Sequence, residues 1–438
     1  MREVDYLIHG EFVVTVDSSL NVLKNGAVAV KDSTIIDTGF YEDLSKRYKA
    51  RSVLGGPQSL VMPGLINTHT HAPMVYFRGL ADDLPLKEWL EKYIWPAEAR
   101  WLSTEFVRDA TELACLEMLR AGVICFNDMY FFSDSTAEVA KQMGMRAVIS
   151  PGILDFPTPG GSGPEEYLRK AEDFILKWKY DEYIRPAVAP HAIYTCSKDT
   201  LLKAKALATK YYVPVHIHLS ETEWEVKESL KNFNKRPVEY LYSIEFLDSS
   251  VIAAHAVWLD EKEIDLMAEK GASVAHCIES NLKLASGIAP VPLMIKKGVK
   301  VSFGTDGAAS NNDLDLLSEV SLAARLHKAI AGDPTVLNAR TALLMATRWA
   351  AEAIGLGSTT GSIEKGKKAD LIICNLDKPH LTPLYDIYSH IVYAMKSSDV
   401  ETVMINGKVI LNQGKLKTGD EREILKKARL WQEKIKAP

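Results

Sequence analysis

Residues 60–71, LVMPGLINTHTH, carry a short apolar run into two histidines separated by one residue. Seven further short apolar runs follow along the chain, and stretches with helical periodicity separate them. The eight predicted strands are 60–67, 123–129, 146–153, 184–189, 213–219, 251–255, 272–277 and 299–305. Strands that alternate with helices indicate βα units, and eight such units predict a closed α/β fold, the (β/α)8 TIM-like barrel.

The intervening helices have recognisable ends. Ser103 precedes an amphipathic stretch that ends at Gly122, and Ser197 precedes one that runs to Tyr211. Serine is a favoured helix N-cap because its side chain accepts a hydrogen bond from a free backbone N–H of the first turn. Both stretches therefore fit the helical half of a βα unit.

Both ends of the chain have a different pattern, in which apolar and polar residues alternate. We expect antiparallel strands at 4–16 and 26–38 and again at 369–375 and 400–413, with Asn406-Gly407 as a hairpin turn. The two ends are predicted to fold together as a small β-sandwich domain of residues 1–59 and 365–438. Residues 60–364 would form the catalytic barrel.

Composition excludes several classes of protein. The 438 residues include 52 basic and 57 acidic side chains, for a formal net charge of −5, so no basic face for nucleic acid is expected. No apolar stretch is long enough to span a membrane, and the acidic N-terminus is not a signal peptide. The five cysteines are odd in number and have no CxxC spacing, which favours the reducing cytoplasm. A homo-oligomer is left open.

The strongest functional signal is a set of polar residues at the ends of predicted strands, where barrel active sites lie. His69 and His71 point to the same face because alternate residues of a strand do so. With His218 and Asp306 from across the barrel, they could hold one divalent ion. Three imidazoles and a carboxylate suit Zn2+, and also Fe2+, cobalt or manganese.

Structural roles are the alternative for each of these residues. A lone His-x-His pair is more often a packed or surface pair, and a lone aspartate at a strand end is more often a helix cap. The coincidence of such groups on several strands of one barrel favours a metal site. His216 shares a face with His218 and competes with it as a ligand. Trp89, Trp95 and Met129 are candidates for lining the pocket, with core packing as the favoured role for each.

The resemblance to a known family rests on five segments: VMPGLINTHTHAPM, NDMYFF, HIHLSETEWEV, ESNLKLASGIAPVP and FGTDGAASNN. They resemble the amidohydrolase superfamily, and within it the methylthioadenosine/S-adenosylhomocysteine deaminases and the 5′-deoxyadenosine deaminases. The closing segment KADLIICNLDKPHLTP is similar to the family's return to its β domain. The likeness implies hydrolytic deamination of adenosine-type nucleosides to inosine analogues.

The resemblance also implies roles for individual residues. Its metal ligands fall on His69, His71, His218 and Asp306. Its acid that protonates the ring falls on Glu221, and its histidine that contacts the attacking oxygen falls on His255, with Asp306 transferring protons. Its ribose-binding acid matches Glu98, in Trp95-Pro96-Ala97-Glu98, and its base-contacting histidine matches His191.

Two departures from related patterns narrow the expectation. Relatives with two metals bridge them through a lysine on strand 4, and residues 185–195, RPAVAPHAIYT, contain none, which implies a single ion. Members that hold S-adenosylhomocysteine clamp its carboxylate with arginines in and after strand 3. Here no arginine follows Arg146 until Arg169. A buried carboxylate without a cation is costly, so we predict a preference for small, uncharged 5′ groups.

Rival functions stay open at this point. The ESNLKLASG segment also resembles s-triazine chlorohydrolases and aminohydrolases, and free guanine or cytosine is a further class of substrate. Glu98 discriminates between them because a triazine or free base has no ribose diol. A catalytically inactive scaffold is the remaining alternative, and the complete ligand set argues against it.

Overall fold

The computed structural model describes residues 1–436, and eight parallel strands form its centre. They are β5 (Leu65–Thr70), β6 (Val123–Tyr130), β7 (Arg146–Ile153), β8 (Ile184–Pro186), β10 (Val215–Leu219), β11 (Val251–His255), β12 (Ser273–His276) and β13 (Val301–Phe303), with β9 (Ala189–Pro190) extending β8. The pairing runs β5-β6-β7-β8 and β10-β11-β12-β13. Backbone bonds join the two arcs: His216 N–H donates to Val188 O at 2.9 Å, and Asp306 N–H donates to His69 O at 3.0 Å. The predicted closed barrel is confirmed.

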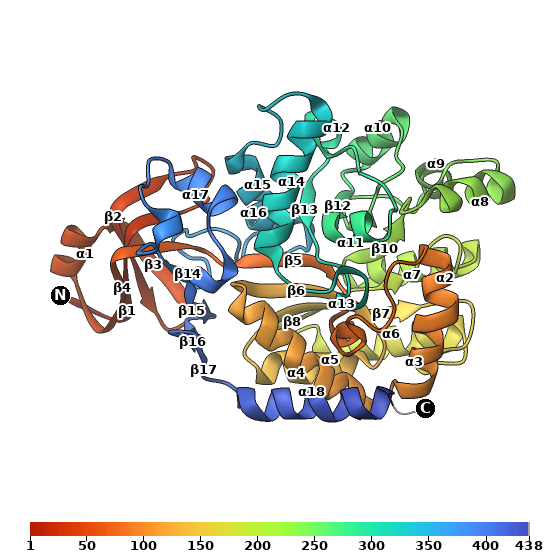
Figure 1. Ribbon diagram of the computed structural model, residues 1–438, viewed down its shortest axis with the longest axis horizontal. Helices are drawn as coiled ribbons and strands as arrows, with labels where there is room; N and C mark the ends of the chain where they lie inside the picture. The colour runs from red at the N-terminus through yellow and green to blue at the C-terminus, as the bar shows by residue number, and fades with distance from the viewer. Residues whose placement is uncertain (437–438) are drawn as a thin grey trace.

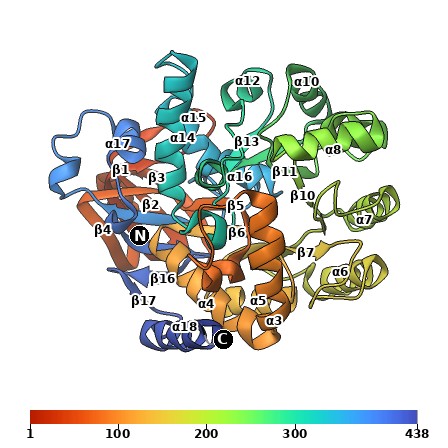
Figure 2. The ribbon, with the colours of Figure 1, turned by 45° about the vertical axis from the view of Figure 1, so that its right-hand side comes forward.

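Helices surround this barrel (Figures 1 and 2). The long ones follow their strands: α4 (Thr104–Arg120), α5 (Ser133–Gln142), α6 (Pro164–Trp178), α7 (Lys198–Tyr211), α8 (Glu223–Phe233), α10 (Glu261–Lys270) and α14 (Leu316–Ala331). Shorter ones are η1 (Ala72–Phe77), α2 (Leu86–Trp89), η2 (Leu90–Ile94), α3 (Trp95–Trp101), α9 (Pro237–Ser243), α11 (Ile278–Lys283), α12 (Val291–Lys296), α13 (Ala308–Asn311), α15 (Ala339–Ala346) and α16 (Arg348–Ala353). Ser103 and Ser197 are N-caps as predicted, since their hydroxyls accept from Phe106 N–H and Thr200 N–H.

The two chain ends combine in one eight-stranded sheet beside the barrel (Figure 1). Its order is β17-β16-β15-β14-β4-β1-β2-β3, with β1 (Arg2–Val14), β2 (Val22–Lys31), β3 (Thr34–Phe40), β4 (Tyr48–Pro63), β14 (Leu371–Asn375), β15 (Val400–Ile405), β16 (Lys408–Asn412) and β17 (Lys415–Leu416). Helix α1 (Tyr41–Arg47) packs on it. The sheet curls over an apolar core, and its edge strand β3 thereby comes close to the chain just before β14. There the Ile35 N–H donates to Lys367 O at 2.9 Å. The β domain formed by both termini is confirmed.

Two predicted strands are divided in the structure. The 26–38 run breaks after Lys31, where Asp32, at φ +54°, makes a hairpin turn into β3. Short polar residues such as Asp tolerate this left-handed conformation. The 60–67 run is split at Gly64, with its first part in β4 and its second in β5. A Cβ at Gly64 would lie 2.2 Å from Ile124, so the chain passes too close to β6 there for any side chain.

The C-terminal segment returns to the barrel. Helix α18 (Glu421–Lys436) lies along α4 at the lower edge of Figure 1. The indole of Trp431 donates to Asp109 Oδ2 at 2.9 Å, and Lys427 lies within 2.9 Å of carboxylates of Asp109 and Glu112. Two turns, η3 (Pro379–Leu381) and η4 (Ser397–Asp399), flank α17 (Ile387–Tyr393) earlier in this segment. Residues assigned to the small β domain by sequence thus also brace the catalytic barrel.

A buried ion pair joins the two domains. Arg146, which begins β7, donates from Nε to Asp370 Oδ2 at 2.7 Å, and these side chains are 2% and 0% exposed. Removing one partner leaves a buried charge unpaired, so Arg146→Met is expected to lower the free energy of unfolding by about 3–5 kcal/mol. Chemical denaturation measures this loss. The control is Arg120→Met, at an exposed pair with Glu421, where about 0–1 kcal/mol is expected. Equal losses for both variants would contradict the prediction.

Candidate active site

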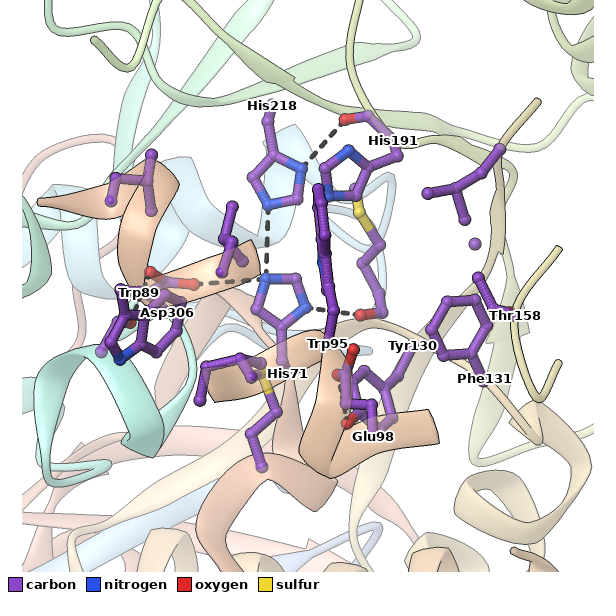
Figure 3. Close-up of a pocket in the computed structure, with 18 of the residues that line it drawn as sticks. His71, Trp89, Trp95, Glu98, Tyr130, Phe131, Thr158, His191, His218 and Asp306 are labelled. Atoms are coloured by element: carbon purple, nitrogen blue, oxygen red, sulfur yellow. Dashed lines mark hydrogen bonds and ion pairs between the residues drawn. The ribbon is translucent and has the colours of Figure 1, made fainter. Parts of the chain in front are cut away.

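A cavity of about 340 Å³ opens at the carboxyl ends of the barrel strands. Figure 3 shows that side chains from several strands and from the segment after β5 converge on it. Seven of the eight residues to which the resemblance assigns a role line it, and the eighth, His69, is fully buried: the seven are His71, Glu98, His191, His218, Glu221, His255 and Asp306. The barrel therefore brings together residues that are far apart in the chain.

Three imidazoles and one carboxylate meet at the floor of this cavity. Nε2 of His69 lies 3.2 Å from Asp306 Oδ1, and Nε2 of His71 lies 3.3 Å from the same oxygen. Nε2 of His218 lies 3.3 Å from Nε2 of His71. Two overlapping groups, His69–His71–Asp306 and His69–His218–His255, each hold their ligand atoms within 4.8 Å. Because they share His69, they describe one candidate metal centre.

The opposite nitrogens of these rings are already engaged. The Nδ1 of His71 donates to Met129 O at 2.5 Å, and the Nδ1 of His218 donates to His191 O at 2.9 Å. The Nδ1 of His69 lies 2.8 Å from Nε2 of His216. Metal-binding histidines characteristically use one ring nitrogen in this way, which fixes the ring and presents the other nitrogen to the ion. Nε2 of His69 is buried without a hydrogen-bond partner, so these residues fit a cation.

His216 has a supporting position in this arrangement. Its Nε2 lies 2.8 Å from Nδ1 of His69, and it belongs to neither group of candidate metal ligands. Its place supports the choice of His218 over His216 as the ligand from β10. It also explains why two histidines on one strand are both buried.

Asp306 is held in a demanding geometry. Its φ is +61°, in the left-handed region, and its Oδ2 accepts hydrogen bonds from Ser280 and Ser310 hydroxyls at 2.7 Å each. A Cβ at the nearby Gly304 would lie 2.7 Å from the Cβ of His69, so only glycine allows β13 to approach β5 this closely. These contacts leave Oδ1 of Asp306 facing the imidazoles.

Glu221 and His255 lie next to the candidate metal centre. Glu221 is 6% exposed, and burial raises the pKa of its carboxyl, which favours the protonated form. Its Oε2 is 3.8 Å from His255 Nε2. The loop that carries Glu221 is fixed by Glu225, whose carboxylate accepts the N–H groups of Ser220 and Glu221 at 2.9 Å each. His255 is oriented by Asn281 Oδ1, 2.9 Å from its Nδ1.

Glu98 and His191 face the outer part of the cavity. Glu98 comes from α3, and Tyr130 donates to its Oε1 at 2.6 Å. Burial raises the pKa of Glu98 to about 7. The Nδ1 of His191 lies 3.0 Å from Thr195 Oγ1, which leaves Nε2 as the ring nitrogen available to a ligand.

Several contributing residues were missed by sequence analysis, although all lie in the segments that carry the family resemblance. They are Tyr130, Glu225, Ser280, Asn281 and Ser310. The available signal was the unusual density of polar residues in those segments. Trp89, Trp95 and Met129, for which core packing was favoured over pocket lining, all line the cavity.

Comparison with known proteins gives the family. The amidohydrolase family profile matches residues 60–410. The chain belongs to the amidohydrolase family. It is 57% identical over 433 residues to a 5-methylthioadenosine/S-adenosylhomocysteine deaminase of Thermodesulfovibrio yellowstonii, covering 98% of this chain and 99% of the relative. A 5′-deoxyadenosine deaminase of Methanosarcina acetivorans is 43% identical, covering 99% of each chain.

Solved structures place the fold in the same family. A zinc-bound adenosine deaminase from Xanthomonas campestris superposes with a TM-score of 0.98 at 42% identity, covering 99% of each chain. An atrazine chlorohydrolase from Arthrobacter aurescens superposes with a TM-score of 0.90 at 24% identity, covering 98% of this amidohydrolase and all of that chain. The latter likeness shows a shared fold alone. These comparisons favour the deaminases over the triazine alternative.

Two further expectations concern the rest of the chain. All five cysteines are buried, and none is paired in a disulfide within residues 1–436. Within residues 1–436, no helix is long and apolar enough to cross a membrane.

Proposed function

We propose that this amidohydrolase deaminates adenosine-type nucleosides, namely 5′-methylthioadenosine, 5′-deoxyadenosine and adenosine, to inosine analogues and ammonia. The observation that carries the proposal is that one cavity contains both a buried acid beside the metal centre, Glu221, and a second buried carboxylate, Glu98, farther out. The first suits a ring nitrogen and the second suits a ribose diol. The names of the relatives, all deaminases of adenosine compounds, support it.

The metal centre is proposed to hold one divalent ion, with Zn2+ favoured over Fe2+. His69, His71, His218 and Asp306 would hold it, because their free ligand atoms meet at one point. When bound, a divalent cation supplies the Lewis acidity that makes water a nucleophile near neutral pH. The zinc in the adenosine deaminase from Xanthomonas campestris supports this choice.

The chain's own residues would carry the proton transfers. Attack of water at C6 of adenine moves electrons onto N1, where protonated Glu221 donates its proton. Asp306 accepts one proton of the attacking water and later delivers it to the departing ammonia. The second water proton passes from the C6 oxygen to Glu221 as the C6–N bond breaks, which restores the acid. His255 would form a hydrogen bond with the attacking oxygen through Nε2 and so align it, and Asn281 keeps its ring in place through Nδ1. His191 would donate to a second ring nitrogen, which fixes the plane of the base.

The preferred 5′ group is proposed to be small and uncharged. The wall near β7 is mainly apolar, with Phe131, Leu154, Phe156, Pro157 and Pro159 around Thr158, and no lysine or arginine lines the cavity among residues 1–436. A carboxylate held there would lack a charged hydrogen bond worth about 1.5–3 kcal/mol, so kcat/KM for methylthioadenosine should exceed that for S-adenosylhomocysteine by about 10–100-fold. The control substrate is an uncharged 5′-alkylthioadenosine whose chain is as long as that of S-adenosylhomocysteine. Its kcat/KM separates the effect of the carboxylate charge from the effect of the size of the 5′ group. Equal values for methylthioadenosine and S-adenosylhomocysteine would overturn this preference.

One panel of substrates tests the proposed reaction. The metal-loaded protein is incubated with methylthioadenosine, 5′-deoxyadenosine, adenosine, S-adenosylhomocysteine, guanine, cytosine and a chlorotriazine. Release of ammonia or chloride is measured together with the purine absorbance. Ammonia from the nucleosides supports the proposal. Turnover of only a free base or the triazine would refute the proposal and favour the alternative function, an aminohydrolase or chlorohydrolase of such rings. A protein that cannot be loaded with metal would instead be a scaffold without activity.

Location and assembly complete the proposal. The five free thiols support a cytoplasmic location. The proposed binding partner is a small nucleoside substrate, not a nucleic acid or a membrane. A homo-oligomer is included as a proposal that size-exclusion chromatography with light scattering tests. A monomeric mass at micromolar concentration would remove it.

A further inference from the structure

Tyr130 is the last residue of β6 and lines the cavity. Its side chain is buried, and its hydroxyl donates to Glu98 Oε1 at 2.6 Å (Figure 3). Within the described chain, this is the one hydrogen bond of the Glu98 carboxylate, so Oε2 stays open to the cavity. The neighbouring residue on the strand, Met129, accepts from His71 through its carbonyl.

One strand end therefore holds groups from both parts of the site. Met129 fixes a ring of the metal centre, and Tyr130 fixes the carboxylate that faces the outer cavity. Glu98 itself comes from α3, a seven-residue helix in the connection between β5 and α4 rather than from the barrel. Without Tyr130, its flexible side chain would be placed only by that connection, because a glutamate has three rotatable bonds.

The geometry points to Tyr130 as a positioning residue that sets the Glu98 carboxylate to bridge the 2′ and 3′ hydroxyls of the substrate ribose. This inference rests on the proposed function. A carboxylate offers two oxygens with about four acceptor sites, so one oxygen can keep the phenol while the pair still receives two vicinal hydroxyls. Pinning Oε1 to a barrel strand fixes the plane of the carboxylate at a set distance from the metal centre. Preorganisation of this kind strengthens binding without new contacts.

Adenosine and 2′,3′-dideoxyadenosine form the matched pair of substrates, because they differ only in the diol. Tyr130→Phe is expected to raise KM for adenosine about tenfold, the cost of one charge-assisted hydrogen bond, with kcat within about twofold. The KM for the dideoxy analogue should stay unchanged. In a Glu98→Ala background, which removes the preference for the diol, adding Tyr130→Phe should have no further effect.

Tyr76→Phe is the control for removing a buried phenol hydroxyl. The hydroxyl of Tyr76 is buried without a partner, and its ring packs on Phe106 outside the cavity. Tyr76→Phe should have the wild-type KM and kcat on both substrates. The melting temperature and the metal content of Tyr130→Phe are compared with those of Tyr76→Phe to check that both variants fold equally well. Equal losses of Tyr130→Phe on both substrates, or an undiminished loss in the Glu98→Ala background, would overturn the positioning role. Failure to deaminate adenosine at all would instead overturn the proposed function.

Discussion

Glu221→Gln should lower kcat for an adenosine-type substrate by about 10²–10⁴-fold, the usual contribution of a general acid, while KM changes little. Glutamine keeps the shape of the side chain but has no acidic proton for N1. The position is buried beside His255, and Glu225 holds its backbone N–H at 2.9 Å, so the loop should keep its geometry. Steady-state kinetics with methylthioadenosine measure the loss.

The pH profile provides a second test of the same group. Burial raises the pKa of Glu221, and the acid acts in its protonated form. Activity that depends on it is therefore full below the raised pKa and declines as the pH increases through it. The Glu221→Gln variant should lose this alkaline decline from its residual kcat profile.

The matched control for Glu221→Gln is Glu223→Gln on the first turn of α8. Glu223 is exposed and pairs with Lys227 at 2.9 Å, so its charge lies near the site without entering the chemistry. An exposed ion pair contributes about 0–1 kcal/mol, and kcat should stay within about twofold of the wild type. Equal kinetic losses in the two variants would mean that only the local charge matters, which would rule out proton donation by Glu221.

The barrel was predictable because its signals are local in sequence. Each strand is a short apolar run, and its helix begins at a capping residue such as Ser103 or Ser197. The exact ends were not predictable where another element decides them. Gly64 separates β4 from β5 because Ile124 of a neighbouring strand fills the space that a side chain would need.

Sequence analysis named most of the polar residues that line the candidate site, but not the contacts that hold them in place. A single histidine at a strand end has common structural explanations, but histidines and an aspartate at the ends of several strands of one barrel favour a metal site together. The contacts that fix them are formed by ordinary residues, such as Asn281 against His255 and a backbone carbonyl of Met129 against His71. Such contacts depend on how neighbouring strands and loops pack against one another in three dimensions, and no periodicity encodes them. Tyr130 is an example, since a tyrosine at a strand end is also a common core residue.

Asp306→Asn is expected to reduce kcat/KM by at least about 10³-fold, because it affects both the metal site and the proton transfer. The φ of +61° at this position is one that asparagine adopts as readily as aspartate, so the backbone should tolerate the change. The loss would therefore be chemical. An amide has one acceptor oxygen, which cannot both face the imidazoles and accept from Ser280 and Ser310.

Metal content after dialysis and kcat at saturating zinc separate the two effects of Asp306→Asn. If the carboxylate is a ligand, zinc per chain falls, and if it also transfers protons, kcat stays low when zinc is restored. Ser280→Ala is the graded comparison, because it removes one support of Oδ2 and leaves the carboxylate. Loss of such an outer contact should weaken metal affinity by about 10–100-fold with a smaller effect on kcat at saturating zinc. An Asp306→Asn protein with full zinc and wild-type turnover would exclude Asp306 from both roles, and the acceptor of the water proton would then have to be sought at His255.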